Sequence, residues 1–151
     1  QLVGKIVGGN AKDGKRLKDS FNEAVPAFAK LQSNLKRAAK RGYLVGLCGR
    51  KLYIREERKL LSQLLQASGA VVCKKWVQLT HTEINKQFGP EQAFLMAWVH
   101  DEVQIACKNK DIADECREIA IRMARDTGRH FNTKIRIDAE GNLGKSWLDC
   151  H

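Results

Sequence analysis

The 151-residue sequence is 43% hydrophobic and 29% charged, the composition of a globular domain large enough to bury a core. No apolar run approaches the ~20 residues of a membrane span, so a membrane partner is not expected. The net charge of +10 lies in one part of the chain, because residues 1–60 hold 15 Lys/Arg against 5 Asp/Glu, whereas residues 61–151 hold 12 of each. This distribution favours an anionic partner, most simply a nucleic acid, over a basic surface that only aids solubility.

The chain contains five cysteines, an odd number, and no two of them have the C-x-x-C spacing. This usage argues against a zinc site or a disulfide framework, and it favours buried thiols in a reducing intracellular compartment. The chain also begins without Met and without a signal-peptide pattern, so we expect it to be a cut part of a longer protein. The cysteines are Cys48, Cys73, Cys107, Cys116 and Cys150.

Residues 10–42 are predicted to form two basic helices. Asn10 is a candidate cap for the first, Pro26 lies where the second would begin, and Gly42 would end it. Four cations gather in the last turns of the second helix, where they either complement the negative end of the helix dipole or contact phosphates. The sequence leaves both interpretations open. These cations are Lys36, Arg37, Lys40 and Arg41.

A short hairpin and a long helix are predicted next. Residues 43–54 contain two β-prone runs on either side of Gly49, which is typical of a hairpin. Residues 56–84 carry leucine and valine at helical spacing, and Gln66 interrupts that apolar face. Residues 88–92, FGPEQ, break the chain.

The second half of the chain is predicted to combine a hairpin, a helix and a strand. Residues 93–107 contain two apolar runs separated by three polar residues, and residues 110–131 have helical periodicity. Residues 134–140 alternate with period 2 and predict a strand. We therefore expect an α+β fold with an antiparallel sheet, formed by the hairpin and this strand and packed by helices. The helix residues expected to face inward are Ile112, Cys116, Ile119, Ala120 and Met123.

The adjacent acids Asp101 and Glu102 are unusual between two apolar strands, because buried like charges are costly. One explanation is a solvated hairpin tip. The other is a divalent-metal site, since Mg²⁺ prefers carboxylate oxygens. Neighbouring strand residues point to opposite sides, so Asp101 is the acid expected to face the metal directly. His100 could act as an acid or base, donate a hydrogen bond or contact a phosphate.

Four stretches in this order resemble the C-terminal part of family A DNA polymerases, with the closest likeness to the replicative polymerases of short-tailed phages. MAWVHDEVQIAC at 96–107 is similar to motif C of that family, and GLCGRKLYI at 46–54 resembles the stretch leading into the palm. LLQASGAVVCKKW at 64–76 resembles the helix that carries a minor-groove-reading glutamine. IDAEGNLGKSWLDCH at 137–151 is similar to the C-terminus of such polymerases.

The resemblance implies a role for each polar residue of these stretches. Asp101 would be one of two carboxylates that hold the catalytic metal ions, and Glu102 a nearby, supporting acid of the same catalytic metal site. His100 would be a neighbour of the primer terminus. Gln66 would contact the minor groove, although a glutamine exposed on the helix surface is the alternative. Ser62 stands where the family often has Asn, and its shorter side chain puts that minor-groove contact in doubt.

The same resemblance implies a polymerase fragment. Residues 1–42 would be the end of the fingers subdomain and residues 43–151 the C-terminal part of the palm, with Arg50 contacting DNA near the primer end unless it is only a solvated hairpin residue. The expected cofactor is Mg²⁺, two ions in the complete enzyme, and the expected partners are DNA primer-template and deoxynucleoside triphosphates. The second aspartate, in motif A, and the nucleotide-binding fingers helix would lie before residue 1.

Three further expectations follow. The fragment would be inactive alone, would act in the cytoplasm of a phage-infected or bacterial cell, and would expose an unpaired sheet edge where motif A is missing. That edge would favour self-association or pairing with the missing N-terminal part of the polymerase. The alternatives are a non-catalytic nucleic-acid-binding module derived from a polymerase and a purely structural domain with a solvated hairpin tip.

Overall fold

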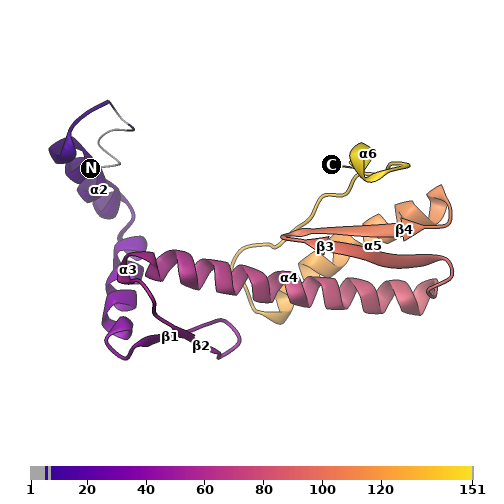
Figure 1. Cartoon of the computed structure of the whole chain (residues 1–151), viewed down its shortest axis with the longest axis horizontal. Coiled ribbons are helices and arrows are strands. Elements are labelled where there is room, and N and C mark those ends of the chain that lie inside the picture. The colour runs from indigo at the N-terminus through magenta and orange to yellow at the C-terminus, as the bar shows by residue number, and fades with distance from the viewer. Residues whose placement is uncertain (1–5, 7, 151) are drawn as a thin grey trace. The chain divides into compact units, whose positions relative to one another are not determined.

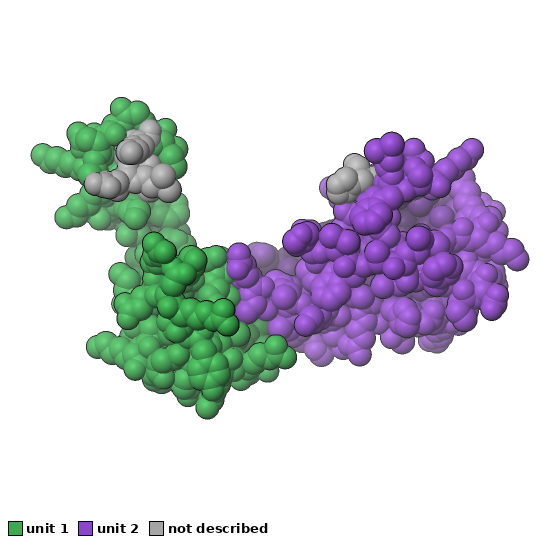
Figure 2. Space-filling model, in the orientation of Figure 1, with its two compact units in different colours: residues 1–65 green, residues 66–151 purple. Residues whose placement is uncertain are grey.

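The structure is a computed structural model that describes residue 6 and residues 8–150. The chain forms two compact units, residues 1–65 and residues 66–151, which are coloured separately in Figure 2. Within the described residues, helices are accompanied by two short antiparallel sheets, so the predicted α+β class is confirmed. In the same residues, no helix is long and apolar enough to cross a membrane. The predicted division at residue 42 stays a prediction.

The first unit begins with helices α2 (Ala11–Ala24) and α3 (Pro26–Ala39), as predicted. The side-chain oxygen of Asn10 accepts hydrogen bonds from the backbone N–H groups of Lys12 and Asp13, at 2.7 and 3.3 Å. The Asp13 carboxylate accepts the Asn10 N–H at 2.9 Å in return, which completes a capping box. Gly42 follows α3 and has a φ of +79°. Glycine is favoured after a helix end because it adopts this left-handed conformation without a Cβ clash.

The predicted hairpin is formed by strands β1 (Tyr43–Val45) and β2 (Lys51–Tyr53), which pair antiparallel. Leu44 faces inward and is only 2% exposed. It packs with Leu35 of α3 and Leu60 in the small core of this unit. The hairpin therefore has one buried face and one solvent face, a consequence of period-2 alternation.

A single-turn 3₁₀ helix, η1 (Glu57–Lys59), leads into the long helix α4 (Leu60–Gln87), which runs from the first unit into the second (Figure 1). The sequence predicted this helix three residues shorter at its C-terminal end. Near the start of α4, the Gln63 side-chain amide donates a 2.7 Å hydrogen bond to the Tyr53 carbonyl. This bond ties the helix to the β1–β2 hairpin.

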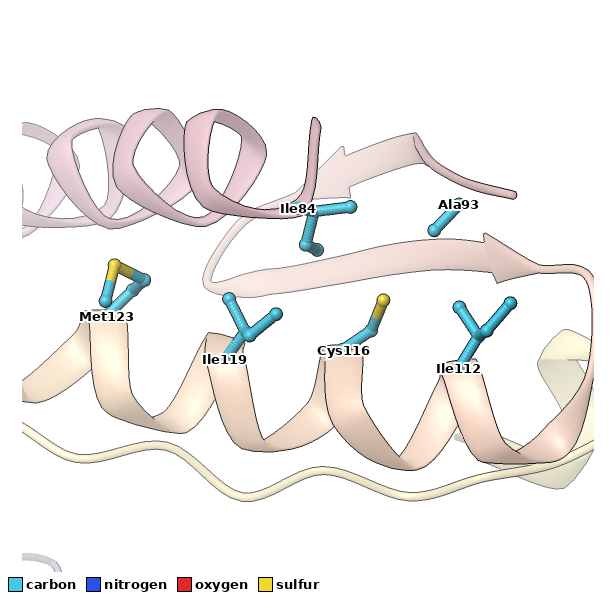
Figure 3. Packing of buried hydrophobic residues seen from close by; sticks show 6 residues of the cluster. All are labelled: Ile84, Ala93, Ile112, Cys116, Ile119 and Met123. Carbon is cyan, nitrogen blue, oxygen red and sulfur yellow. The ribbon is translucent and has the colours of Figure 1, made fainter. Parts of the chain in front are cut away.

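The second unit is built around strands β3 (Ala93–Val99) and β4 (Glu102–Cys107) and helix α5 (Lys110–His130). All five residues predicted to face inward from α5 are buried, because they recur at helical spacing on one face. Figure 3 shows four of them beside Ile84 of α4 and Ala93 of β3. The side chains drawn are Ile84, Ala93, Ile112, Cys116, Ile119 and Met123.

The β3–β4 register contains one irregularity. Leu95 pairs with Ile105 and Ala97 with Gln104, so Met96 is an extra residue in β3. The extra residue of such a bulge is left without a ladder partner. Phe94, before the bulge, is 51% exposed, and Met96 is 65% exposed. The hairpin therefore exposes large apolar side chains at this part of β3.

The predicted strand at residues 134–140 is wrong. Described residues of the sheet are limited to β3 and β4, and residues 134–140 have no ladder partner. The segment instead follows α5, where Asp138 pairs with Arg125 at 3.0 Å and with Arg136 at 2.8 Å. Ile137 lies against Gly128, so closely that a Cβ on this glycine would meet the Ile137 side chain at 3.2 Å. The period-2 pattern therefore reflects packing of one side of an extended segment on a helix. A four-residue helix, α6 (Trp147–Cys150), follows.

Candidate active site

The tip of the β3–β4 hairpin presents the polar triplet of the sequence. Val99 and Glu102 form the last strand pair, which leaves His100 and Asp101 as a two-residue turn. His100 has φ of 55°. A positive φ at the first turn residue is the sign pattern of a type II′ turn, which matches the twist of a hairpin. The Trp98 indole N–H donates a 2.7 Å hydrogen bond to the His100 carbonyl, and this bond stabilises the turn.

The left-handed conformation of His100 is a departure from local preference. Glycine adopts this region freely, whereas a residue with a side chain loses roughly 1 kcal/mol there. Strained backbone of this kind concentrates at functional sites, where the surrounding structure imposes it. The hairpin thus holds a histidine in a position where a purely structural turn favours glycine or asparagine.

The two acids of the triplet have different environments. Asp101 is exposed in the turn, whereas Glu102 is half-buried as the first residue of β4. The Gln104 side-chain amide donates a hydrogen bond to the Glu102 carboxylate from the same face of the strand. The structure therefore separates an exposed carboxylate in the turn from a half-buried carboxylate that is held by its strand neighbour.

Helix α4 contributes a residue to this region that the sequence interpretation missed. Burial raises the pKa of the Cys73 thiol, and the negative charge of Asp101 raises it further. The Cys73 thiol is therefore within range of an electrostatic interaction with Asp101 in the turn. The sequence suggested only a buried thiol at position 73. The seven-residue spacing between Gln66 and Cys73 was a signal that the two residues share one face of a helix. Residues seven apart are two helical turns apart and share a face, so Gln66 and Cys73 share one side of α4.

The structure divides the predicted site residues between the two units. Gln66 and the triplet belong to the second unit. The remaining predicted residues belong to the first unit, and all of them are exposed. Gln66 and Ser62 are exposed on α4 one turn apart. The first-unit residues are Arg50, Ser62, Lys36, Arg37, Lys40 and Arg41.

The four cations at the end of α3 are not neutralised by ion pairs within the described residues. The Arg41 side chain donates a 3.4 Å hydrogen bond to the Ala38 carbonyl, a group of the last turn. This contact fits the interpretation in which a cation complements the helix end. The Arg37 guanidinium donates to the Asn34 side chain, a neutral partner. Among the described residues, no carboxylate forms an ion pair with any of the four cations, so they remain able to contact phosphates.

The donor set at the hairpin tip fits part of a Mg²⁺ coordination shell. Asp101 offers hard carboxylate oxygens, which Mg²⁺ prefers, at an exposed and fixed position. Within the described part of the chain, no group of three His, Cys, Asp or Glu side chains is placed to hold a metal ion. Asp101 could therefore act as one ligand, while the other ligands would come from water, from substrate phosphates or from another polypeptide segment.

Comparison with known proteins shows the family to which this chain belongs. A family model described as DNA polymerase family A matches residues 3–149. The chain belongs to DNA polymerase family A. The likeness read from four stretches of sequence is thereby confirmed.

The similar proteins are DNA-directed DNA polymerases of phages. This family A chain is 35% identical over 170 aligned residues to the DNA-directed DNA polymerase of Enterobacteria phage T3, and 35% identical to that of Escherichia phage T7. It is 28% identical to the DNA-directed DNA polymerase of Escherichia phage Phieco32. These alignments cover 100%, 100% and 99% of the chain but only 24%, 24% and 25% of the relatives. The chain thus spans about a quarter of their length, and for T3 and T7 this quarter is the C-terminal part.

Proposed function

We propose that the chain supplies one metal-binding carboxylate and a set of DNA contacts for template-directed nucleotidyl transfer. The observation that carries this proposal is the exposed Asp101 in a fixed two-residue turn between two apolar strands of a family A chain. The positive φ of His100 beside this acid supports the proposal, because strained backbone concentrates at functional sites.

In this proposal, Asp101 holds Mg²⁺ and Glu102 supports it. Two Mg²⁺ ions, when bound, would lower the pKa of the primer 3′-hydroxyl and neutralise charge on the triphosphate. His100, Gln66 and Ser62 would contact the primer-template near the reacting end. The Glu102 carboxylate accepts a hydrogen bond from the Gln104 side chain. It would therefore support Asp101 by adding negative charge near the metal ion, and it would not take the place of Asp101 as the direct ligand.

The first unit would hold the DNA by its backbone. Lys36, Arg37, Lys40, Arg41 and Arg50 are exposed, and phosphate contacts of this kind supply affinity without reading sequence. We propose residues 1–42 as the end of the fingers subdomain and residues 43–151 as the C-terminal part of the palm.

The other ligands and the nucleotide-binding helix would be provided by a polypeptide that corresponds to the rest of the relatives. The alignments cover only 24% of the T3 and T7 relatives. Each strand of the β3–β4 sheet has one edge without a strand neighbour in the described residues, and such edges bind further strands. We propose that this polypeptide, or a second copy of the chain, pairs there, in the cytoplasm of an infected or bacterial cell.

Mn²⁺ should bind the isolated chain at the hairpin tip. Because Mn²⁺ favours the same oxygen ligands as Mg²⁺ and broadens nearby NMR signals, the backbone amide signals of residues 100–102 should broaden first in a titration. Asp101→Asn, which keeps the shape and removes the charge, should abolish this selectivity. Asp111→Asn, a change of another exposed acid, should leave it intact. Broadening that is strongest elsewhere, or unchanged in Asp101→Asn, would contradict the proposal and favour a non-catalytic nucleic-acid-binding module.

The chain alone should not extend a primer. With Mg²⁺ and deoxynucleoside triphosphates, a templated primer-extension assay is expected to give no product, because one carboxylate cannot hold both ions. A chimera in which this chain replaces the matching C-terminal quarter of the T7 relative should extend the primer. Asp101→Asn in that chimera should reduce incorporation by at least about 100-fold, and Asp111→Asn should not. Incorporation by the isolated chain that depends on Asp101 would refute its predicted inactivity.

A further inference from the structure

The solvent face of the β1–β2 hairpin carries an aromatic and basic surface outside the site described above. Strand pairing places Tyr43 opposite Tyr53 and Val45 opposite Lys51. The alternating pair, Leu44 and Leu52, belongs to the core of the first unit. We call Tyr43, Val45, Lys51 and Tyr53 the hairpin face. Two of these four residues are aromatic, although only 7% of the whole chain is aromatic.

The two tyrosines of the hairpin face form a preformed platform. Their ring centroids are 6.4 Å apart with an interplanar angle of 61°, an edge-to-face contact that limits ring movement. Tyr53 is nevertheless 70% exposed. Its backbone is anchored by the hydrogen bond that the Gln63 side chain donates to its carbonyl. An exposed ring on an anchored backbone offers contact area at a low entropic cost of ordering.

Two cations lie close to the Tyr43 ring of this platform. The Lys51 ammonium nitrogen lies 4.8 Å from the centroid of the Tyr43 ring, and the Arg41 guanidinium carbon lies 5.4 Å from it. Neither cation takes part in an ion pair within the described residues. The Tyr43 ring thus orients two positive groups, while the Tyr53 ring remains accessible.

We propose that the hairpin face binds single-stranded nucleic acid, with one unpaired base stacked on Tyr53 and the adjacent phosphates held by Lys51 and Arg41. A positively charged surface with an exposed aromatic ring is the combination that recognises single strands. A base within a duplex is stacked on both sides and cannot reach the ring, so the face selects unpaired nucleotides. This inference goes beyond the proposed function, because it needs neither Asp101 nor a metal ion.

The decisive measurement compares two labelled oligomers of equal length and charge, about ten nucleotides long. One is oligothymidine, and the other has the same phosphates but no bases. In fluorescence anisotropy with the unmodified chain, oligothymidine should bind roughly 5- to 100-fold more tightly, the range expected for stacking of one base. Equal affinity for the two oligomers would overturn the proposal. This comparison uses no variant, so it is decisive even if a substitution prevents folding.

Variants then locate the contact. Tyr53→Leu should abolish the preference for oligothymidine without weakening binding of the abasic oligomer, whereas Tyr53→Phe should keep the preference. Trp147→Leu removes another exposed aromatic side chain, which is 50% exposed in the second unit, and should have no effect. Equal weakening of both oligomers by Tyr53→Leu would refute stacking on this ring.

The phosphate contacts have a separate signature. Lys51→Gln should weaken both oligomers and reduce the slope of log affinity against log salt by about 0.7, the value for one phosphate of a single strand. Lys30→Gln, at an exposed cation of α3, should leave the slope unchanged. Binding to a blunt duplex, measured in parallel, distinguishes the proposed single-strand binding by the hairpin face from the duplex contacts of the proposed function. If the chain binds the duplex but shows no preference for oligothymidine over the abasic oligomer, only the proposal for the hairpin face is refuted. If it shows that preference but does not bind the duplex, only the proposed duplex contacts are refuted.

Discussion

Replacing Ile84 with alanine is expected to lower the free energy of unfolding of the second unit by about 3 kcal/mol. Ile84 is 2% exposed and joins α4 to the core formed with α5 and the sheet (Figure 3). Alanine would remove buried methyl and methylene groups and leave a cavity between these elements. A loss of this size would shift the midpoint of unfolding strongly in a domain of ordinary stability.

Tryptophan fluorescence in a denaturant titration is suited to this measurement. The three tryptophans are Trp76, Trp98 and Trp147, and all of them belong to the second unit. Leu148→Ala is a matched control, because Leu148 is 88% exposed and its truncation should change the free energy of unfolding by less than about 0.5 kcal/mol. A similar destabilisation by both substitutions, or a loss below about 1 kcal/mol for Ile84→Ala, would contradict the packing described for this core.

Neutralising the four cations at the end of α3 should produce the largest change in DNA binding. With Lys36, Arg37, Lys40 and Arg41 all replaced by glutamine, the slope of log affinity against log salt for duplex DNA should fall by roughly 3 to 4. Raising the salt concentration fourfold would then weaken the variant about 100-fold less than the unmodified chain. Electrophoretic or anisotropy titrations at several salt concentrations would measure both slopes.

Helix α5 provides a control with the same change in net charge. Its four arginines each form an ion pair with a nearby acid, and all four can be replaced by glutamine in the same way. Because these charges are already compensated, the slope should change far less. Equal changes in the two variants would show attraction by net charge alone. An unchanged slope in the α3 variant, with reduced helix stability, would favour the helix-dipole interpretation. The control arginines are Arg117, Arg122, Arg125 and Arg129.

Much of the local structure was predictable because it depends on residues close in sequence. The cap at Asn10 and the beginning of α3 at Pro26 require only the chemistry of single residues and their neighbours. The buried face of α5 follows from residues that recur every three or four positions. The hairpin around residues 100–101 follows from two apolar runs with a polar interruption.

The prediction of a strand at residues 134–140 was wrong for a clear physical reason. Alternation shows that one side of an extended segment is apolar, but it does not show whether the segment has a hydrogen-bonding neighbour. Here Ile137 packs on α5 beside Gly128, and Asp138 is paired with Arg125 of the same helix. A strand needs an adjacent strand to satisfy its backbone groups, and the described chain supplies none at this place.

The sequence by itself determined the four longer helices α2 to α5, the two hairpins, the basic character of the first unit and the polar tip at residues 100–102. It also contained enough family pattern to identify a family A polymerase chain. Only the tertiary structure decided that Asp101 is exposed while Glu102 is held by Gln104, and that the charge of Asp101 acts on the Cys73 thiol of α4. Those features depend on strand register, on turn geometry and on contacts between segments far apart in the chain, and local sequence preferences carry no information about them.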